Sequence, residues 1–276
     1  MADLTLKLHD RNDDVAAAQE LLNRDGALLD PDGDFGGGTE TAVREFQTAA
    51  GLPVTGVIDA ATWQRLRATP EPSPDIPTRA VNFIAQAEVS SRRHYDAACA
   101  RPTWPGEQSG VTIGVGYDLG YQAKFEADWN GLLAPAQIAA LRPWLNKKGQ
   151  AAAPAVAQLA AIQVPWHAAW MVFIHKTLPP EVATTRQAFH GPNPLPPLCL
   201  GALVSLVYNR GPGMDDDAPG DRRREMRQIR DALAAGRTLD VPAALRAMAR
   251  LWPNAKGLRD RREAEAKMFE AGLAQA

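Results

Sequence analysis

Four prolines fall within ten residues, in the segment Ala68-Thr-Pro-Glu-Pro-Ser-Pro-Asp-Ile-Pro77. Proline fixes its own φ, lacks an amide donor and biases the residue before it toward extended backbone. Neither a helix nor a central strand can therefore run through this segment, and no apolar period crosses it. We expect an extended, semi-rigid spacer over 68–77, with separately folded parts over 1–67 and 78–276.

The first part has the signals of three short helices. Asn12 or Asp13, then Thr39, then Asp59 stand where their side chains can cap a helix that carries an apolar stripe. The stretches between these helices are rich in glycine and other turn formers. We therefore expect a small three-helix bundle with its own core.

A longer pattern within this part is specific to one family. It consists of Asp32-Gly-Asp-Phe-Gly36, Thr39, Ala42-Val43, Phe46-Gln47, Gly51-Leu52, Thr55-Gly56, Asp59 and Thr62-Trp63. These residues resemble the peptidoglycan-binding domain found at the ends of many cell-wall hydrolases, over almost all of residues 1–67. The resemblance implies a groove near Phe35 and Thr39 that binds sugar or stem peptide, although Phe35 can equally belong to the core.

The Asp-Gly-Asp loop of this domain also suggests a calcium site of the EF-hand type. Such a loop needs a glutamate at its twelfth position, and counting from Asp30 that position is Thr41. We therefore expect no calcium there.

A second informative pattern lies between Gly110 and Gly120. Apolar residues at 111, 113, 115 and 117 alternate with Thr112, Gly114, Gly116 and Asp118. In a strand, alternate side chains point to opposite faces. A single strand would therefore place Thr112 and Asp118 on one face, separated by a glycine floor over which an extended substrate can lie. The alternative is an ordinary half-buried strand with its polar side toward water.

Residues 78–89 are expected to form a helix that ends near a carboxylate. Val81, Ile84, Ala85 and Glu88 fall on one face at helical spacing. A carboxyl group on an apolar stripe is desolvated, which favours its neutral form and suits a general acid. Together with Asp118 on a more polar surface, Glu88 would complete the carboxyl pair that glycoside hydrolysis requires. Alternatively, Glu88 only forms a salt bridge with a neighbouring arginine.

The order Glu88, Thr112, Asp118 within this context is similar to the active-site segment of phage-type lysozymes of the T4 lysozyme superfamily, and closest to its pesticin-like branch. Residues 203–211 (LVSLVYNRG) and 257–265 (GLRDRREAE) resemble two further segments of the superfamily. The likeness covers about 80–275, unevenly. In the T4 branch the aspartate lies between the glutamate and the threonine, a place that Asp96 roughly occupies here. Asp118 is preferred because it shares a face with Thr112.

The resemblance implies a reaction and a role for each residue. The domain would hydrolyse the β-1,4 bond between N-acetylmuramic acid and N-acetylglucosamine, with inversion of the anomeric centre. Glu88 would donate the proton, Asp118 would position or activate the water, and Thr112 would hold that water. Gly116, Tyr117, Tyr208 and Asn209 are the candidate sugar contacts, although aromatic residues are more often core. Three rival interpretations stay open: a lytic transglycosylase, a bacteriocin-type protein and a non-catalytic cell-wall-binding protein.

The rest of the second part predicts mainly helices. Apolar patterns recur over 134–145, 153–162, 165–174, 198–208, 222–235, 241–251 and 258–273. Helices around one small sheet would make a mainly α, α+β fold. Gly211 can end the helix that begins near Leu198.

Composition limits the partners. Residues 1–70 hold six basic and twelve acidic residues, and the remainder holds 24 basic and 20 acidic residues. A modestly cationic second part suits an anionic polymer such as peptidoglycan, whereas no base-stacking motif favours nucleic acid. Two cysteines and five scattered histidines do not have the spacing of a zinc site. We expect no metal and no organic cofactor.

No apolar run reaches the length of a membrane span, and the first residues lack the layout of a secretory signal. By resemblance to phage lysins, we expect accumulation in the host cytoplasm and release through a holin-type pore to the periplasm and cell wall. The expected target is the peptidoglycan of a Gram-negative host, and the expected state is a monomer.

Overall fold

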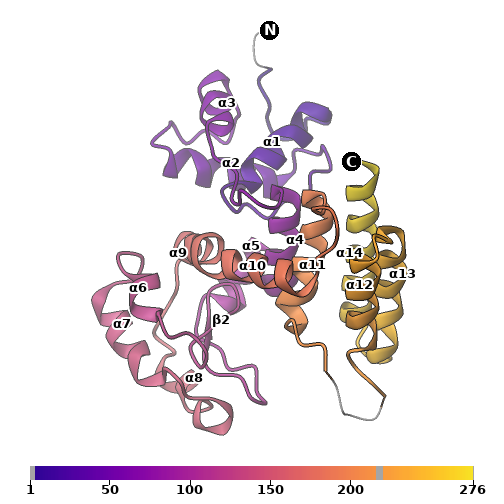
Figure 1. Cartoon of the computed structure of the whole chain (residues 1–276). Coiled ribbons are helices and arrows are strands. Elements are labelled where there is room, and N and C mark those ends of the chain that lie inside the picture. The colour runs from indigo at the N-terminus through magenta and orange to yellow at the C-terminus, as the bar shows by residue number, and fades with distance from the viewer. Residues whose placement is uncertain (1–3, 216–219, 276) are drawn as a thin grey trace. The chain divides into compact units, whose positions relative to one another are not determined.

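The computed structural model describes residues 4–215 and 220–275 (Figure 1). The chain divides into two compact units, each built from two segments. Unit 1 comprises Met1–Pro72 and Glu88–Thr177, and unit 2 comprises Ser73–Ala87 and Leu178–Ala276. Over the described residues the chain is mainly helical with a single two-stranded sheet, which confirms the mainly α, α+β class.

Unit 1 begins with the expected three helices, α1 (Asp13–Asn23), α2 (Gly37–Ala49) and α3 (Ala60–Arg67). They lie together at the indigo and purple end of the chain in Figure 1. Their shared core consists of Leu6, Val15, Ala18, Leu22, Phe35, Ala42, Val43, Phe46, Ile58, Trp63 and Leu66. The predicted bundle therefore exists.

Two of the three predicted caps are confirmed. The Asn12 side chain accepts a hydrogen bond from the amide of Val15 (3.0 Å), and the Asp59 side chain accepts one from the amide of Thr62 (2.8 Å). The prediction that Thr39 caps α2 was wrong. Gly36 holds the cap position without a side-chain bond, because Thr39 is buried inside the first turn, where its Oγ1 accepts a hydrogen bond from Gln19 (3.1 Å).

The proline-rich segment is less free than the sequence predicts. Its first half contacts the N-terminal helices, since Arg24 donates to the carbonyl of Thr69 (3.1 Å) and pairs with Glu71 (2.5 Å). In its second half, Ser73 and Ile76 are 8% and 2% exposed. The prolines do prevent a helix here, but the extended backbone packs rather than standing in solvent.

The second segment of unit 1 contains short helices and the sheet. Its α-helices are α5 (Arg92–His94), α6 (Phe125–Trp129), α7 (Pro135–Leu141), α8 (Ala155–Gln158) and α9 (Trp166–Val172). The π-helical turns are Tyr95–Cys99 and Phe173–Thr177, and the 3-10 turns are Arg142–Trp144 and Gly149–Ala151. The strands are β1 (Thr112–Ile113) and β2 (Tyr117–Asp118).

The single strand expected over 111–118 was wrong. The segment folds into a hairpin, in which β1 pairs antiparallel with β2. Gly114 and Gly116 have φ values of 59° and 69°, which side chains rarely tolerate and glycine adopts freely. These two glycines turn the chain back on itself, so the alternation continues across a turn instead of along one strand.

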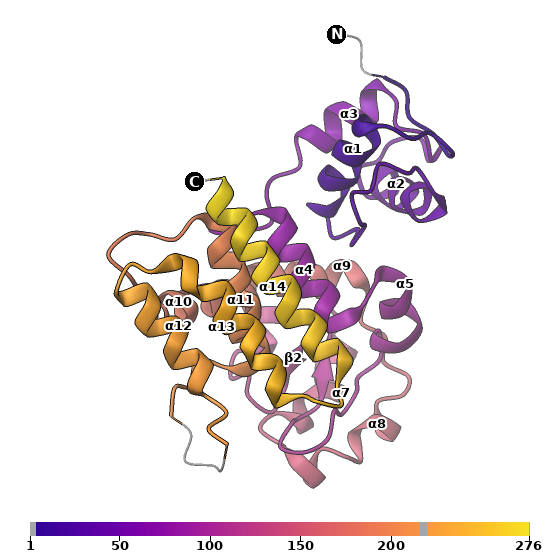
Figure 2. The same cartoon turned by 90° about the vertical axis from the view of Figure 1, so that its right-hand side faces the viewer.

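Unit 2 is a set of longer helices: α10 (Leu178–Ala188), α11 (Pro197–Arg210), α12 (Arg224–Ala234), α13 (Val241–Ala247) and α14 (Lys256–Ala274). The 3-10 turns Thr238–Asp240 and Met248–Leu251 flank α13. α14 packs along α11 and α13, as both views show (Figure 2). Most of α4 (Thr78–Val89) also belongs to unit 2.

Two features hold α11 in this unit. Gly201 permits a close approach to α4, because a Cβ at that position would lie 2.3 Å from the Cβ of Ala80. At the other interface, Glu265 on α14 is fully buried and accepts hydrogen bonds from Ser205 and Arg262, both at 2.7 Å. Gly211 ends the helix with a φ of 70°, which confirms the predicted stop.

Two kinds of feature are absent from the described parts of the chain. No helix among residues 4–215 and 220–275 is both long enough and apolar enough to cross a membrane. Across the same residues, no group of three or more His, Cys, Asp or Glu side chains could hold a metal ion. Cys99 and Cys199 are both free, and Cys199 is buried in α11.

Candidate active site

The hairpin brings two of the three predicted catalytic residues together. Thr112 on β1 lies directly opposite Asp118 on β2. Both the amide and the carbonyl of Thr112 bond to Thr103, at 2.8 and 2.9 Å, so Thr112 and Asp118 form a pair without mutual backbone hydrogen bonds. Side chains approach most closely in such pairs, in which the Cα atoms of the two residues are about 4.5 Å apart. Thr112 and Asp118 therefore share a face, as predicted, but they do so because they pair across two strands and not because they lie along one strand.

The carboxylate of Asp118 is held by backbone amides. Gly110 N–H donates to both of its oxygens at 3.0 Å, and Gly120 N–H donates to Oδ1 at 2.8 Å. The fit is tight, because a Cβ on Gly110 would lie 2.4 Å from Asp118 Oδ1. These two amide donors fix the orientation of the carboxylate. The same contacts also give Asp118 a structural role, which is to join the two ends of the hairpin segment.

Glu88 stands at the end of α4, whose bounds match the prediction. Val81, Ile84 and Ala85 of its stripe are fully buried, whereas Glu88 itself is half-buried. The helix stops one residue later, since Ser90 has a φ of 64°. Glu88 belongs to the same compact unit as the hairpin.

Asp96, the alternative aspartate, has a different setting. It lies in the π-helical turn Tyr95–Cys99, its side chain is 58% exposed, and it pairs with Arg92 at 3.0 Å. Arg92 also contacts Glu45 (3.4 Å) and stacks over the ring of Trp166. Asp96 is therefore part of a surface ion pair and not of the hairpin.

Tyr117 and Gly116, two candidate sugar contacts, differ in exposure. The Tyr117 ring is 2% exposed and packs edge-on against Trp129, with its hydroxyl donating to Asp128 (2.8 Å). Burial, and then the hydrogen bond to Asp128, raise the pKa of this phenol. The structure therefore places Tyr117 in the core, where it anchors β2, while Gly116 stays half-buried at the hairpin turn.

Phe35 and Thr39 lie inside the N-terminal bundle and not at its surface. Phe35 is 0% exposed and belongs to the core, and Thr39 is 3% exposed. Of the two interpretations of Phe35, the structure supports the core. A wall-binding groove near these residues would have to be formed by their exposed neighbours, such as Gly37 and Gly38.

Tyr208 and Asn209 lie in the last turn of α11, half-buried and exposed respectively. Asn209 lines a cavity of about 520 Å³ together with Arg210, Asp215, Arg222, Arg223, Trp252 and Leu258. Arg222 and Arg223 were not predicted from the sequence as site residues. The available signal was three consecutive arginines at 222–224, close in sequence to the Asn-Arg-Gly turn at 209–211.

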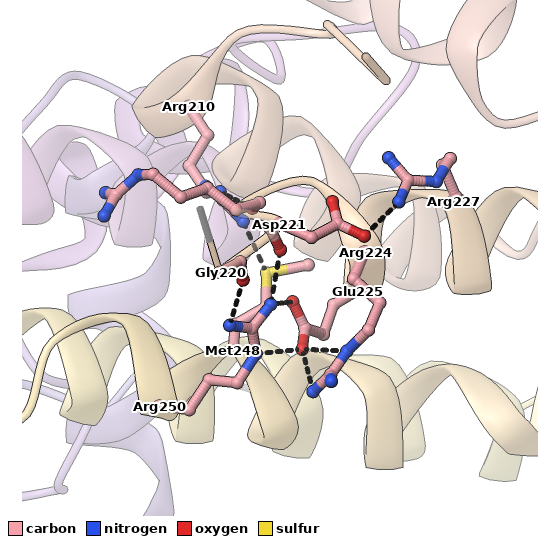
Figure 3. Close-up of polar contacts among 9 residues, drawn as sticks. Arg210, Gly220, Asp221, Arg224, Glu225, Arg227, Met248 and Arg250 are labelled. Atoms are coloured by element: carbon pink, nitrogen blue, oxygen red, sulfur yellow. Dashed lines mark hydrogen bonds and ion pairs between the residues drawn. The ribbon is translucent and has the colours of Figure 1, made fainter. Parts of the chain in front are cut away.

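A polar network fixes the backbone beside this cavity (Figure 3). The buried carboxylate of Glu225 accepts from Arg250 (2.6 and 3.0 Å) and from Arg224 (2.9 Å). Arg250 also donates to the carbonyls of Gly220 (2.8 Å) and Asp221 (2.5 Å). Despite its burial, these guanidinium partners hold the pKa of Glu225 below its usual value.

Residues 11–66 match a family model described as "Putative peptidoglycan binding domain". The match confirms the predicted N-terminal domain and supports peptidoglycan as the partner of the chain. No curated protein matches the sequence. Among solved structures, the crystal structure of the Burkholderia AP3 phage endolysin aligns over 99% of this chain and 100% of its own, with 20% identity and a TM-score of 0.24.

Proposed function

We propose that the protein is a modular endolysin that hydrolyses the β-1,4 bond between N-acetylmuramic acid and N-acetylglucosamine in peptidoglycan. The observation that carries the proposal is the direct pairing of Thr112 with Asp118 in the hairpin, in one compact unit with Glu88. The N-terminal domain supports the choice of polymer, because it matches a peptidoglycan-binding family.

Each residue has a role that its setting suits. Glu88, half-buried at the end of an apolar stripe, protonates the glycosidic oxygen as the bond to the anomeric carbon breaks. Asp118, held by two amides, accepts a proton from the water that attacks that carbon from the opposite face. Thr112 holds this water with its hydroxyl group. The reaction inverts the anomeric centre and needs no metal or organic cofactor.

One observation favours a second candidate, a lytic transglycosylase. The backbone amides of Gly110 and Gly120 already engage the Asp118 carboxylate, which is compatible with a purely structural aspartate. Glu88 would then be the only catalytic carboxyl group. The muramic acid would close on its own 6-hydroxyl group, and the product would carry an anhydro-muramic end.

Mass spectrometry of the products released from purified peptidoglycan tests both candidates. We expect reducing N-acetylmuramic ends from the wild type. We expect a loss of about 10²- to 10⁴-fold in rate for Glu88→Gln, which keeps the shape of the side chain but cannot donate the proton. Asp118→Asn should give a comparable loss. Asp96→Asn, which removes a surface charge on the neighbouring turn, is the matched control and should retain activity.

The other outcomes decide against the proposal in distinct ways. Anhydro-muramic ends would identify a transglycosylase, and freed stem peptides would mean that a different bond is cut. Near-normal activity of a folded Glu88→Gln protein would remove Glu88 from the mechanism. Wall binding without any released ends would favour a non-catalytic binding protein.

The place of action follows from the same interpretation. We propose that the protein acts as a monomer on the wall of a Gram-negative host, reaching it from the host cytoplasm through a holin-type pore. Lysis that depends on a co-expressed holin would support this route.

A further inference from the structure

The cavity at the end of α11 has an unusual balance of charge. Its lining offers three guanidinium groups, Arg210, Arg222 and Arg223, against one carboxylate, Asp215. Its volume of about 520 Å³ is within the range of sites that take small organic ligands. Arginine presents a planar fork of donors that fits a carboxylate with two parallel hydrogen bonds. The cavity is thus suited to an anionic group.

Hydrogen bonds hold the described backbone segments on two sides of the cavity. Arg223 donates to the carbonyl of Arg210 (2.8 Å), which joins the segment before α12 to the end of α11. Arg210 donates to the carbonyl of Arg222 and to the sulfur of Met248 (3.2 Å). The Glu225–Arg250 network holds the next turn (Figure 3). Such pre-organisation lowers the entropic cost of binding a ligand.

The charges in this region repel one another. Arg210 has its pKa lowered to about 10, first by burial and then by the neighbouring cations Arg223, Arg262 and Arg222. A bound anion would relieve this repulsion, since an opposite charge nearby favours the charged form of a guanidinium group.

Besides its charged residues and Asn209, the cavity has two apolar residues in its lining, Trp252 and Leu258. The ring of Trp252 lies beside two guanidinium groups, 5.3 Å from Arg210 and 5.6 Å from Arg262, and Leu258 lines the same cavity. A ligand with carboxylates, an ammonium group and short aliphatic stems would match the arginines, Asp215 and these two walls together. A phosphate polymer or a nucleic acid offers no ammonium for Asp215.

We propose that this cavity binds the carboxylates of the peptidoglycan stem peptide. The proposal rests on peptidoglycan being the substrate, and it adds a peptide subsite to the glycan-cleaving function. Stem peptides carry free carboxylates along a short chain of small residues, and many contain a diamino acid with an ammonium group. Arg222 and Arg223 hold the carboxylates, Asp215 pairs with the ammonium group, and Trp252 packs against the aliphatic part.

Calorimetric titration with the free tetrapeptide alanyl-glutamyl-diaminopimelyl-alanine tests the subsite directly. Arg222→Gln removes one guanidinium group but keeps the carbonyl to which Arg210 donates. We expect it to weaken binding about 10- to 100-fold, the usual effect of losing a charge-assisted hydrogen bond. Arg230→Gln, on the helix α12 that follows Arg222, is paired with Asp231 outside the cavity; it is the matched control and should bind as the wild type does.

Two further probes make the titration decisive. The same peptide with its carboxyl groups converted to amides should bind at least tenfold more weakly to the wild type. Equal binding of the acid and amide forms would overturn the proposal, and so would tighter binding of inorganic phosphate than of the peptide.

Kinetics separate this proposal from the proposed function. With peptide-bearing glycan, Arg222→Gln should raise KM about tenfold with little change in kcat. The reason is that Arg222 would bind the stem peptide equally strongly in the ground state and in the transition state. With glycan stripped of its peptides, Arg222→Gln and wild type should be equal. An equal loss on both substrates would overturn the peptide subsite. If the wild type cuts neither glycan, the proposed function fails, and the titration still decides whether the cavity binds stem peptide.

Discussion

At the scale of single residues, the candidate site depends on two glycines that touch a carboxylate. A Cβ on Gly110 would meet Asp118 Oδ1 at 2.4 Å and the amide nitrogen of Gly120 at 2.5 Å. The Asp118 carboxylate is held by two amide donors and the Gly120 nitrogen belongs to the backbone, so Gly110→Ala must displace the carboxylate, push the two backbone segments apart, or both. We expect a loss of about 1–3 kcal/mol in the free energy of unfolding, as in other overpacked sites, together with a displaced Asp118 carboxylate and most of the wall-hydrolysing activity lost.

Urea unfolding and a turbidity assay on purified walls measure the two effects. Gly257→Ala is the matched control, because nothing lies within 4 Å of the added Cβ and its backbone is not left-handed; stability should change by about 0.5 kcal/mol or less. If Gly110→Ala keeps full activity while losing stability, the Asp118 carboxylate is a structural clamp only.

Residue roles were harder to predict from the sequence than residue environments. The apolar positions 111, 113, 115 and 117 are all buried as expected. Tyr117, Phe35 and Thr39 also fit their family patterns, but the structure places all three inside a core. A pattern residue that packs and a pattern residue that binds carry the same signal in one sequence, and only burial separates them.

At the scale of elements, the cap of α3 makes a prediction about pH. The amide of Thr62 and then its hydroxyl group, both hydrogen-bonded to the Asp59 carboxylate, lower the pKa of Asp59. A carboxyl whose pKa is lower in the folded state stabilises the fold above its unfolded pKa, about 3.9, and loses that effect as the pH falls through the folded value. Asp59→Ala should therefore destabilise α3 by about 1 kcal/mol at pH 7, and the difference from wild type should shrink below about pH 4.

Hydrogen exchange of the α3 amides, at pH 7 and in acid, is the measurement. Asp30→Ala removes an exposed aspartate of the same domain and serves as the control, with no change expected in α3. A difference between Asp59→Ala and wild type that persists undiminished in acid would mean that the charge of Asp59 contributes nothing to the cap.

Elements with strong local signals could be predicted, and those that depend on rare backbone states could not. The bounds of α4 and the glycine stop of α11 follow from apolar spacing and cap chemistry. The hairpin could not be predicted in this way. In the sequence, Gly114 and Gly116 are indistinguishable from small residues of a continuous strand, and only the structure shows their positive φ. Likewise α10 (Leu178–Ala188) was missed, since Pro179 and Pro180 suggest a loop, whereas in the structure they directly follow the π-helical turn Phe173–Thr177.

At the scale of the whole molecule, the sequence predicts a semi-rigid spacer between two separately folded parts, and within unit 1 the N-terminal helices also contact the segment that carries the hairpin. The indole of Trp166 donates to the carbonyl of Gly26 (2.9 Å), across 140 positions of the chain. Arg92 reaches Glu45 at 3.4 Å. No local pattern encodes contacts of this separation. Within unit 1, the peptidoglycan-binding domain therefore packs against the segment that carries the hairpin. These contacts limit how far the domain can move on its linker.

Gly26 is the position at which this attachment can be tested. It has a φ of 80°, and a Cβ there would lie 2.6 Å from the ring of the buried Trp170. Gly51, in the same domain, has a φ of 68° with nothing within 4 Å. Gly26→Ala and Gly51→Ala should thus share a backbone strain of about 1–2 kcal/mol, but only Gly26→Ala should also separate the domain from α9. We expect faster hydrogen exchange over 166–172 and faster proteolysis within 68–72 for Gly26→Ala alone. Equal behaviour of the two variants would mean that strain, and not the contact with Trp170, determines the attachment.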